Sequence, residues 1–240
     1  MNKRVKGGTP LYGVAVGVLM LEARFPRILG DMGHAQSWPF PVHYRVVRGA
    51  TPDLVVRRRA EGTLDAFIDA ARTLVADGVR GITTNCGFLS LFQEELSRAV
   101  AVPVLTSSLM QVAMVNRLLP PGKRAGILTI NQSSLTPEHL HNAQVPEGTP
   151  IATTEGRREF TRVILQDEPE MDIAAARQDN IDAAGELAAN QQVGAIVLEC
   201  TNMTPYVFDI ARTTNLPVFS IFNLVRWMHE GLTPPSFSVP

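Results

Sequence analysis

The sequence predicts an α/β protein of two pseudo-symmetric lobes, each a parallel-sheet α/β sandwich, with an active-site cleft between them. Three observations lead to this prediction. Short apolar runs alternate with stretches of helical spacing, as is typical of parallel α/β layers. Residues 79–105 and 193–219 repeat one pattern without a gap. Each repeat carries one of the two cysteines, Cys86 and Cys200, at the equivalent position.

The repeat has a constant offset of 114 residues, from 86 to 200 and from 103 to 217. More weakly, residues 13–16 and 126–129 match as the opening strands of the two halves. We therefore expect a first lobe of residues 1–107 and 221–240 and a second lobe of residues 108–220. The paired positions are Val79/Val193, Ile82/Ile196, Leu96/Ile210, Arg98/Arg212 and Val104/Val218.

Apolar runs and helix signals place the individual elements. Residues 60–75 have apolar side chains at helical spacing, and Thr136-Pro137-Glu138 has the cap, proline and acid of a helix start. The expected strands are 12–20, 43–48, 79–84, 102–106, 124–130, 150–154, 194–199 and 217–220. The expected helices are 58–77, 88–99, 108–119, 136–143, 156–165, 171–190, 204–214 and 222–231.

Composition narrows the function classes. The chain of 240 residues has a formal net charge of −1, and its longest basic run is 57–59, so we expect neither a nucleic acid nor a membrane as partner. The apolar run 14–21 is too short to span a bilayer and lacks a signal-peptide pattern, so we expect a cytoplasmic protein. Two cysteines do not make a disulfide framework.

The two cysteines have the same local setting, since each ends an apolar strand and precedes a helix. Such a turn leaves free backbone N–H groups that suit a carboxylate, and a helix start favours thiolate over thiol. Four neighbours allow close approach and supply polar groups to a substrate: Asn85, Gly87, Thr201 and Asn202. A small carboxylate-containing substrate held there would have its α-carbon between two sulfurs.

A base on one side of that carbon and an acid on the other would invert it without a cofactor. One sulfur would start as thiolate and the other as thiol, with coupled titrations. No phosphate-binding or dinucleotide-binding glycine motif is present, so we expect no cofactor. We expect no metal either, because His139 and His141 lie two apart on a predicted helix and face different directions.

The motifs TTNCG at 83–87, LECTN at 198–202 and GILT at 126–129 with the following 133–134 turn resemble the aspartate/glutamate racemase superfamily. That superfamily also contains hydantoin racemases, maleate isomerases and arylmalonate decarboxylases. The resemblance covers essentially the whole chain. It implies two α/β lobes, a cleft between them, catalysis independent of pyridoxal phosphate by two cysteines, and a homodimer.

By this resemblance, Cys86 and Cys200 match the catalytic cysteines, and Thr201 matches a residue that holds the substrate carboxylate. Asn85, Thr129 and Ser133 fit polar substrate-binding positions more loosely. Two departures argue against a cell-wall glutamate racemase. Its Asp-Ser pair after the first strand is replaced by LMLE at 19–22, and its CysThrHis is CysThrAsn here. The presence of both cysteines argues against an arylmalonate-type decarboxylase, which needs one.

The segment from Glu22 to Pro41 is long, rich in Pro and Gly, and follows the first strand, so we expect it over the ligand-binding ends of the strands. Its Arg24 and Arg27 are either clamps for a second acid group or structural arginines. Glu199 either tunes the thiol of Cys200 or is a hydrogen-bonded acid at a strand end.

The leading hypothesis is therefore an isomerase, a cofactor-independent racemase or epimerase of an Asp-, Glu- or hydantoin-like substrate in amino acid metabolism. One alternative is a maleate-type cis–trans isomerase or a lyase in which one cysteine acts as nucleophile. Another is a non-catalytic carboxylate-binding protein, although binding alone does not require a second thiol.

Overall fold

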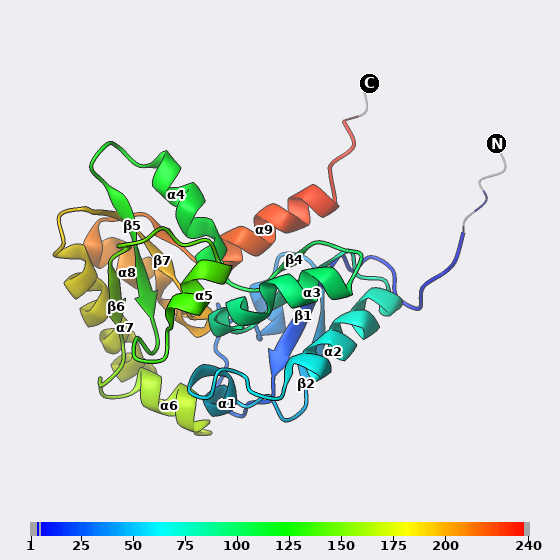
Figure 1. Cartoon of the computed structure of the whole chain (residues 1–240), viewed down its shortest axis with the longest axis horizontal. Coiled ribbons are helices and arrows are strands. Elements are labelled where there is room, and N and C mark those ends of the chain that lie inside the picture. The colour runs from blue at the N-terminus through cyan, green and yellow to red at the C-terminus, as the bar shows by residue number, and fades with distance from the viewer. Residues whose placement is uncertain (1–3, 5, 238–240) are drawn as a thin grey trace.

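The computed structural model describes residues 4 and 6–237, and within them the chain forms two four-stranded parallel sheets (Figure 1). The first sheet has the order β2-β1-β3-β4 and the second the order β6-β5-β7-β8. The repeat thus gives two copies of one topology, and the predicted two-lobe α/β fold is confirmed. The strands are β1 (Val16–Leu21), β2 (Val42–Val47), β3 (Gly81–Thr84), β4 (Val104–Leu105), β5 (Arg124–Thr129), β6 (Ile151–Thr153), β7 (Val193–Leu198) and β8 (Val218–Phe219).

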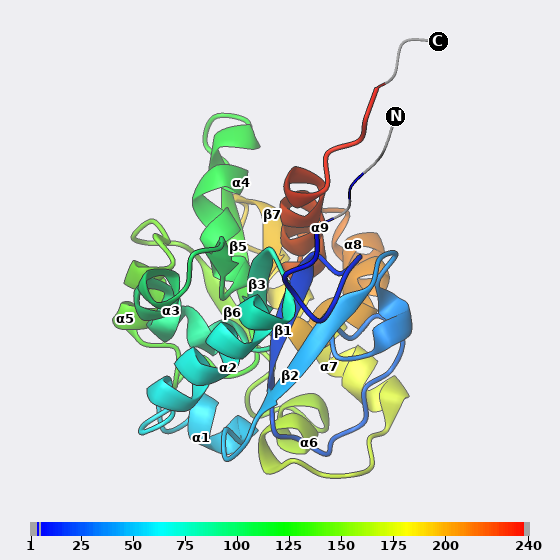
Figure 2. The same cartoon turned by 90° about the vertical axis from the view of Figure 1, so that its right-hand side faces the viewer.

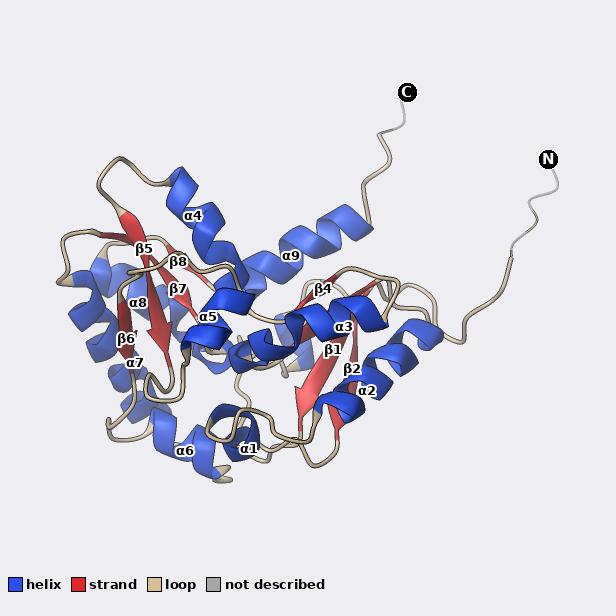
Figure 3. Ribbon diagram, viewed as in Figure 1, coloured by secondary structure: helices blue, strands red, loops and turns tan. Residues whose placement is uncertain are grey.

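Helices flank both sheets, as the colouring by secondary structure in Figure 3 shows. The α-helices are α1 (Pro52–Val56), α2 (Leu64–Asp77), α3 (Gln93–Ala99), α4 (Val112–Leu118), α5 (Pro137–Asn142), α6 (Phe160–Gln166), α7 (Ile173–Ala188), α8 (Val207–Thr214) and α9 (Ile221–Leu232). The 3₁₀ turns are η1 (Ala35–Ser37), η2 (Gly87–Phe92), η3 (Ser108–Gln111) and η4 (Thr201–Tyr206).

The predicted helix 58–77 is wrong at its start. Arg59 and Ala60 both have positive φ angles, of 54° and 53°, and so turn the chain out of a helix. The short helix α1 precedes this turn, and α2 begins only after Thr63. The spacing of apolar residues does not reveal such a change of backbone direction. In the structure, α1 is separated from α2 by this turn and contacts α6 (Figure 2).

The last helix, α9, packs on the first sheet although its sequence follows the second repeat. Its buried residues Ile221, Leu224 and Val225 belong to one apolar cluster with Val16 and Val18 of β1. Residues 1–3, 5 and 238–240 of the expected first lobe lie outside the described part of the chain. The division into residues 1–107 with 221–240 and residues 108–220 is a proposal.

One continuous apolar core joins the two halves. It includes Leu19 and Ile82 of the first sheet, Ile127 and Val197 of the second, and both cysteines. In the part of the chain that the structure describes, no helix is long and apolar enough to cross a membrane.

Candidate active site

Cys86 and Cys200 occupy the same place in the two sheets. Cys86 follows β3 and is the N-cap of η2, whereas Cys200 follows β7 and is the N-cap of η4. Both caps have extended backbone, and both strands lie inside their sheets. Since the carboxyl ends of parallel strands meet at one edge, each sheet directs its cysteine toward the region between the lobes.

Both thiols line one narrow cavity, and the empty space of about 330 Å³ around it includes open solvent at its mouth. The polar groups of the wall come from the two cysteine turns, and the remainder is apolar or aromatic. The lining residues are Leu21, Phe25, Pro52, Val56, Asn85, Cys86, Phe88, Ile130, Ile164, Leu165, Glu199, Cys200 and Asn202.

Glu199 is a carboxyl group inside this cavity wall, and its side chain is fully buried. Its Oε2 accepts a hydrogen bond of 2.8 Å from Thr129 Oγ1, whereas Oε1 has no hydrogen-bond partner among the described residues. Oε1 lies against Gly87, where a Cβ atom would collide with it and with the Glu199 carbonyl oxygen. Burial raises the pKa of Glu199 to about 7, although the Thr129 hydrogen bond acts in the opposite direction.

The expectation that the helix starts would favour thiolates is wrong for the free protein. Burial raises the pKa of the Cys86 thiol, and the nearby charge of Glu199 raises it further. The same two causes raise the pKa of Cys200. The backbone N–H groups at the turns lower both values, but desolvation of a charged sulfur in this apolar cavity is the larger effect.

A series of buried hydrogen bonds connects Cys200 to Asp31. The Cys200 thiol donates to Asn202 Oδ1 at 3.6 Å, and Asn202 Nδ2 donates to Asp31 Oδ2 at 2.6 Å. Asp31 also pairs with Arg27 at 2.9 Å, and the Arg27 guanidinium lies 4.5 Å from the centroid of the Phe25 ring. Arg27 is thus held by an ion pair to Asp31, while its Nη2 is buried without a hydrogen-bond partner among the described residues.

The other residues of the two turns link the lobes. Thr201 Oγ1 donates to the carbonyl oxygen of Asn85 at 2.6 Å, so the second turn is fastened to the first. The Asn85 side chain accepts from the backbone N–H of Leu21 at 2.8 Å. Asn85 and Asn202 line the cavity, whereas Thr201 lies behind it as a connector.

Thr129 and Ser133 lie farther from the cavity than expected. Thr129 touches the site only through Glu199. Ser133 lies in a neighbouring polar hollow, where its hydroxyl donates to Glu155 Oε1 at 2.5 Å and its backbone N–H donates to Glu155 Oε2 at 2.9 Å. Ser133 therefore does not line the cavity of the two cysteines.

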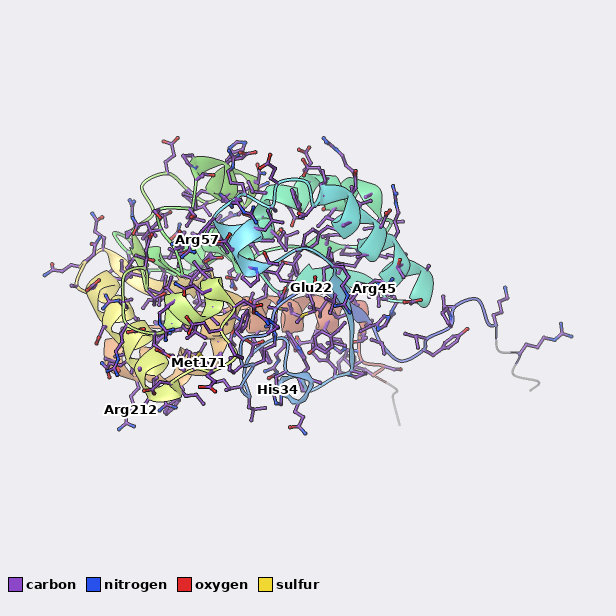
Figure 4. All side chains as sticks on the ribbon, turned by 90° about the horizontal axis from the view of Figure 1, so that it is seen from below. Glu22, His34, Arg45, Arg57, Met171 and Arg212 are labelled. Atoms are coloured by element: carbon purple, nitrogen blue, oxygen red, sulfur yellow. The ribbon has the colours of Figure 1, made fainter. Side chains whose placement is uncertain are left out.

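The connection from Glu22 to Pro41 forms part of the cavity wall, as expected from its length, and contributes Phe25. The backbone N–H groups of Arg24 and Phe25 donate to Asp167 Oδ1 at 2.5 and 3.1 Å, which ties this connection to the second lobe. Figure 4 views this face from below, with Glu22 and His34 labelled on the connection.

Several wall residues were not predicted from the sequence. Phe88 directly follows the TTNCG motif at 83–87, and this position was the one available signal. Val56 of α1 and Ile164 and Leu165 of α6 come from segments without any chemical motif. Asp31 carried no signal beyond its place in a long connection.

The buried carboxyl of Glu199 leads to a stability prediction. Its folded pKa of about 7 exceeds its ordinary value of 4.5, so the stabilising contribution is present below pH 4.5 and is lost as the pH rises through 7. The loss amounts to about 3 kcal/mol, at about 1.4 kcal/mol per pKa unit. Urea unfolding of wild type and Glu199→Gln at pH 4.5 and 7.5 measures it. We expect the stability of wild type relative to Glu199→Gln to fall by this amount, and an unchanged difference would contradict the buried ionisation.

Comparison with known proteins identifies relatives along most of the chain, although no family model matches it. Dimethylsulfoniopropionate lyase 7 of Emiliania huxleyi is 32% identical over 242 residues, which are 94% of this chain and 69% of that protein. Dimethylsulfoniopropionate lyase 3 of the same organism is 30% identical over 94% of this chain, which spans 62% of that relative. A dimethylsulfoniopropionate lyase of Durusdinium is 27% identical over 85% of this chain and 70% of its own length.

Solved structures confirm the fold. Arylmalonate decarboxylase has a TM-score of 0.59 at 17% identity, over 94% of this chain and 96% of that chain. Allantoin racemase from Pseudomonas fluorescens has a TM-score of 0.59 at 14% identity, over 94% and 100%. A glutamate racemase from Bacillus anthracis has a TM-score of 0.57 at 16% identity, over 91% and 83%. At these identities the likeness shows the fold alone.

The comparisons correct the expected reaction class. The curated relatives are named lyases, so the expectation of an isomerase is wrong, and the lyase alternative is the better supported one. The resemblance to the aspartate/glutamate racemase superfamily is confirmed at the level of the fold. The chain belongs to the family of the dimethylsulfoniopropionate lyases and has the fold of the aspartate/glutamate racemase superfamily.

Proposed function

We propose that the protein is a lyase that eliminates a β-substituent from a small propionate, with dimethylsulfoniopropionate as the first candidate substrate. The observation that carries the proposal is the 32% identity to a dimethylsulfoniopropionate lyase along 94% of the chain. The cavity supports it, because two thiols and a carboxyl group from the two lobes line one common space.

The reaction follows from the chemistry of this substrate, which has a carboxylate at one end and a dimethylsulfonio group on the β-carbon. A base removes a proton from the carbon next to the carboxylate. That C–H electron pair forms the carbon–carbon double bond while the carbon–sulfur bond breaks and its pair remains on sulfur. The products are acrylate, neutral dimethyl sulfide and one proton, and the sulfide leaves without being protonated.

The residues of the cavity fit these steps. We propose that one of Cys86 and Cys200 acts as the base, since both line the space in which the α-carbon would lie. Asn85 and Asn202 are proposed to contact the carboxylate end, whereas the space beside Gly87 is filled by Glu199. Phe88 offers an aromatic surface for the sulfonium, since ring faces attract cations.

Incubation of the purified protein with dimethylsulfoniopropionate tests the proposal. We expect dimethyl sulfide in the headspace and an equal amount of acrylate in solution. The matched control substrate is 3-methylthiopropionate, which has the same carbon chain but would have to release a poor thiolate leaving group, and we expect no turnover of it. If no sulfonium- or amine-substituted propionate gives an acrylate product, the proposed function is wrong.

We also propose that the chain forms a homodimer and acts in the cytoplasm. Exposed apolar side chains support the first point: Met114 and Leu118 on α4 and Trp227 on α9 are 47%, 69% and 66% exposed. Met114 and Trp227 also line an apolar groove between these two helices. Light scattering of the purified protein measures the oligomeric state.

A further inference from the structure

Glu199 is the one carboxyl group in the wall of the cavity, and the elimination itself does not use it. The side chain is fully buried, one oxygen is held by Thr129, and the other has no hydrogen-bond partner in the described chain. A buried oxygen without a partner is costly, so its retention calls for an explanation. Glu199 is also adjacent to Cys200 in sequence, and its free oxygen lies against Gly87, the neighbour of Cys86.

The proposed lyase reaction releases one proton per turnover, and this proton must be transferred from the site to solvent. The base cysteine starts as a thiol, because burial keeps both thiols protonated in the free protein. It must lose that proton before it can take one from the substrate, and each turnover then produces one proton in excess. The cavity wall is otherwise apolar or amide-bearing, so a nearby acceptor is needed.

We propose that Glu199 is the proton acceptor of the site: its carboxylate takes the proton of the cysteine that acts as base, and it returns one proton to solvent per turnover. This inference rests on the proposed lyase function. The S–H bond breaks and an O–H bond forms on Glu199, which leaves a thiolate and a neutral carboxyl group. The thiolate then takes the α-proton as the carbon–sulfur bond of the substrate breaks. After product release, Glu199 gives its proton to water.

The charges around Glu199 agree with this exchange. Moving the proton from a thiol to Glu199 leaves the total charge of the buried group unchanged, which avoids placing two negative charges together. Cys86 reaches the site from the first turn, and Cys200 lies on the same turn as Glu199. Asp31 and Arg27 face the cysteines from the 22–41 connection as an ion pair. His139 lies behind Phe88, edge to face with its ring at 5.0 Å, and burial lowers its pKa to about 4, so it is neutral.

The kinetic test compares wild type, Glu199→Gln and Glu199→Asp with dimethylsulfoniopropionate. Glutamine keeps the size and the Thr129 contact but takes up no proton. We expect kcat to fall by about 10²- to 10³-fold in Glu199→Gln, within the range for proton-transfer groups, with KM changed by less than about threefold. Glu199→Asp should regain part of the loss. The control is Glu186→Gln, an exposed acid on α7 that is paired with Arg157, and we expect it to match wild type.

A second readout does not depend on turnover. Iodoacetamide labelling of the intact protein between pH 5 and 10, with the labelled cysteine located by peptide mass spectrometry, follows the thiolate directly. In wild type we expect the labelling rate to level off near pH 7, where Glu199 ionises and its charge opposes the thiolate, before a second rise at high pH. Glu199→Gln should show no plateau, and it should label faster than wild type above pH 7 because the opposing charge is absent.

The outcomes separate this inference from the proposed function. A plateau near pH 7 in wild type that is absent in Glu199→Gln supports the inference even if no lyase substrate is found. Identical labelling profiles in the two proteins overturn it even if dimethyl sulfide is produced. A Glu199→Gln variant that raises KM and leaves kcat unchanged also overturns it, because the residue would then bind substrate and not move a proton.

Discussion

Cys86→Ala and Cys200→Ala are expected to have unequal effects on elimination, with one variant losing at least about 10³-fold in kcat and the other keeping measurable turnover. The size of the larger loss is that of removing a general base. The asymmetry follows from the leaving group, since a neutral sulfide departs without a proton from the opposite thiol. Headspace measurement of dimethyl sulfide under saturating substrate gives both values.

Cys86→Ser and Cys200→Ser are the matched variants. Serine is close to cysteine in size, but its hydroxyl is too weak an acid to supply the base at neutral pH. The serine variant at the base position should therefore be as inactive as the alanine variant. Complete loss in both alanine variants, with intact folding by circular dichroism, would contradict a single-base elimination.

Gly87→Ala is expected to be the most damaging single-methyl change in the cleft. The added Cβ would collide with the carbonyl oxygen and Oε1 of Glu199, and one of these is backbone. The two residues come from opposite lobes, so the collision is relieved only by moving the lobes apart or displacing the carboxyl group. We expect a loss of about 1–3 kcal/mol in stability, as for other overpacked sites, with a fall in kcat of at least about 10-fold. Thermal unfolding and turnover measure the two effects.

Gly185→Ala is the control for this substitution. Gly185 lies in α7 with no atom near the position of an added Cβ, and its helical backbone accepts any residue. Alanine there should stabilise the protein by about 0.5–1 kcal/mol, because glycine is the poorer helix former. Equal behaviour of the two variants would mean that the contact between Gly87 and Glu199 does not hold the lobes together.

Much of the framework could be predicted because it is local or repeated. All eight expected strands are present, and β3 with β7 and their cysteine turns follow from the 114-residue repeat. The prediction was wrong where backbone conformation decides, as at Arg59 and Ala60, whose left-handed turn separates α1 from α2. The prediction that helix starts would favour thiolates was also wrong. A helix start can be recognised in the sequence, whereas the burial that raises the pKa of the thiols cannot.

The sequence by itself determined two lobes of repeated pattern and one cysteine at the end of a strand in each. It could do so because strand periodicity and an internal repeat are properties of neighbouring residues. The tertiary structure alone decided which side chains share the cavity with those thiols. It brings Phe25, Val56 and Ile164 from three separate segments to one wall, and it buries Glu199 between the two turns. These contacts depend on the packing of one lobe against the other, and the loss of solvent that follows from this packing sets the proton affinities of the site.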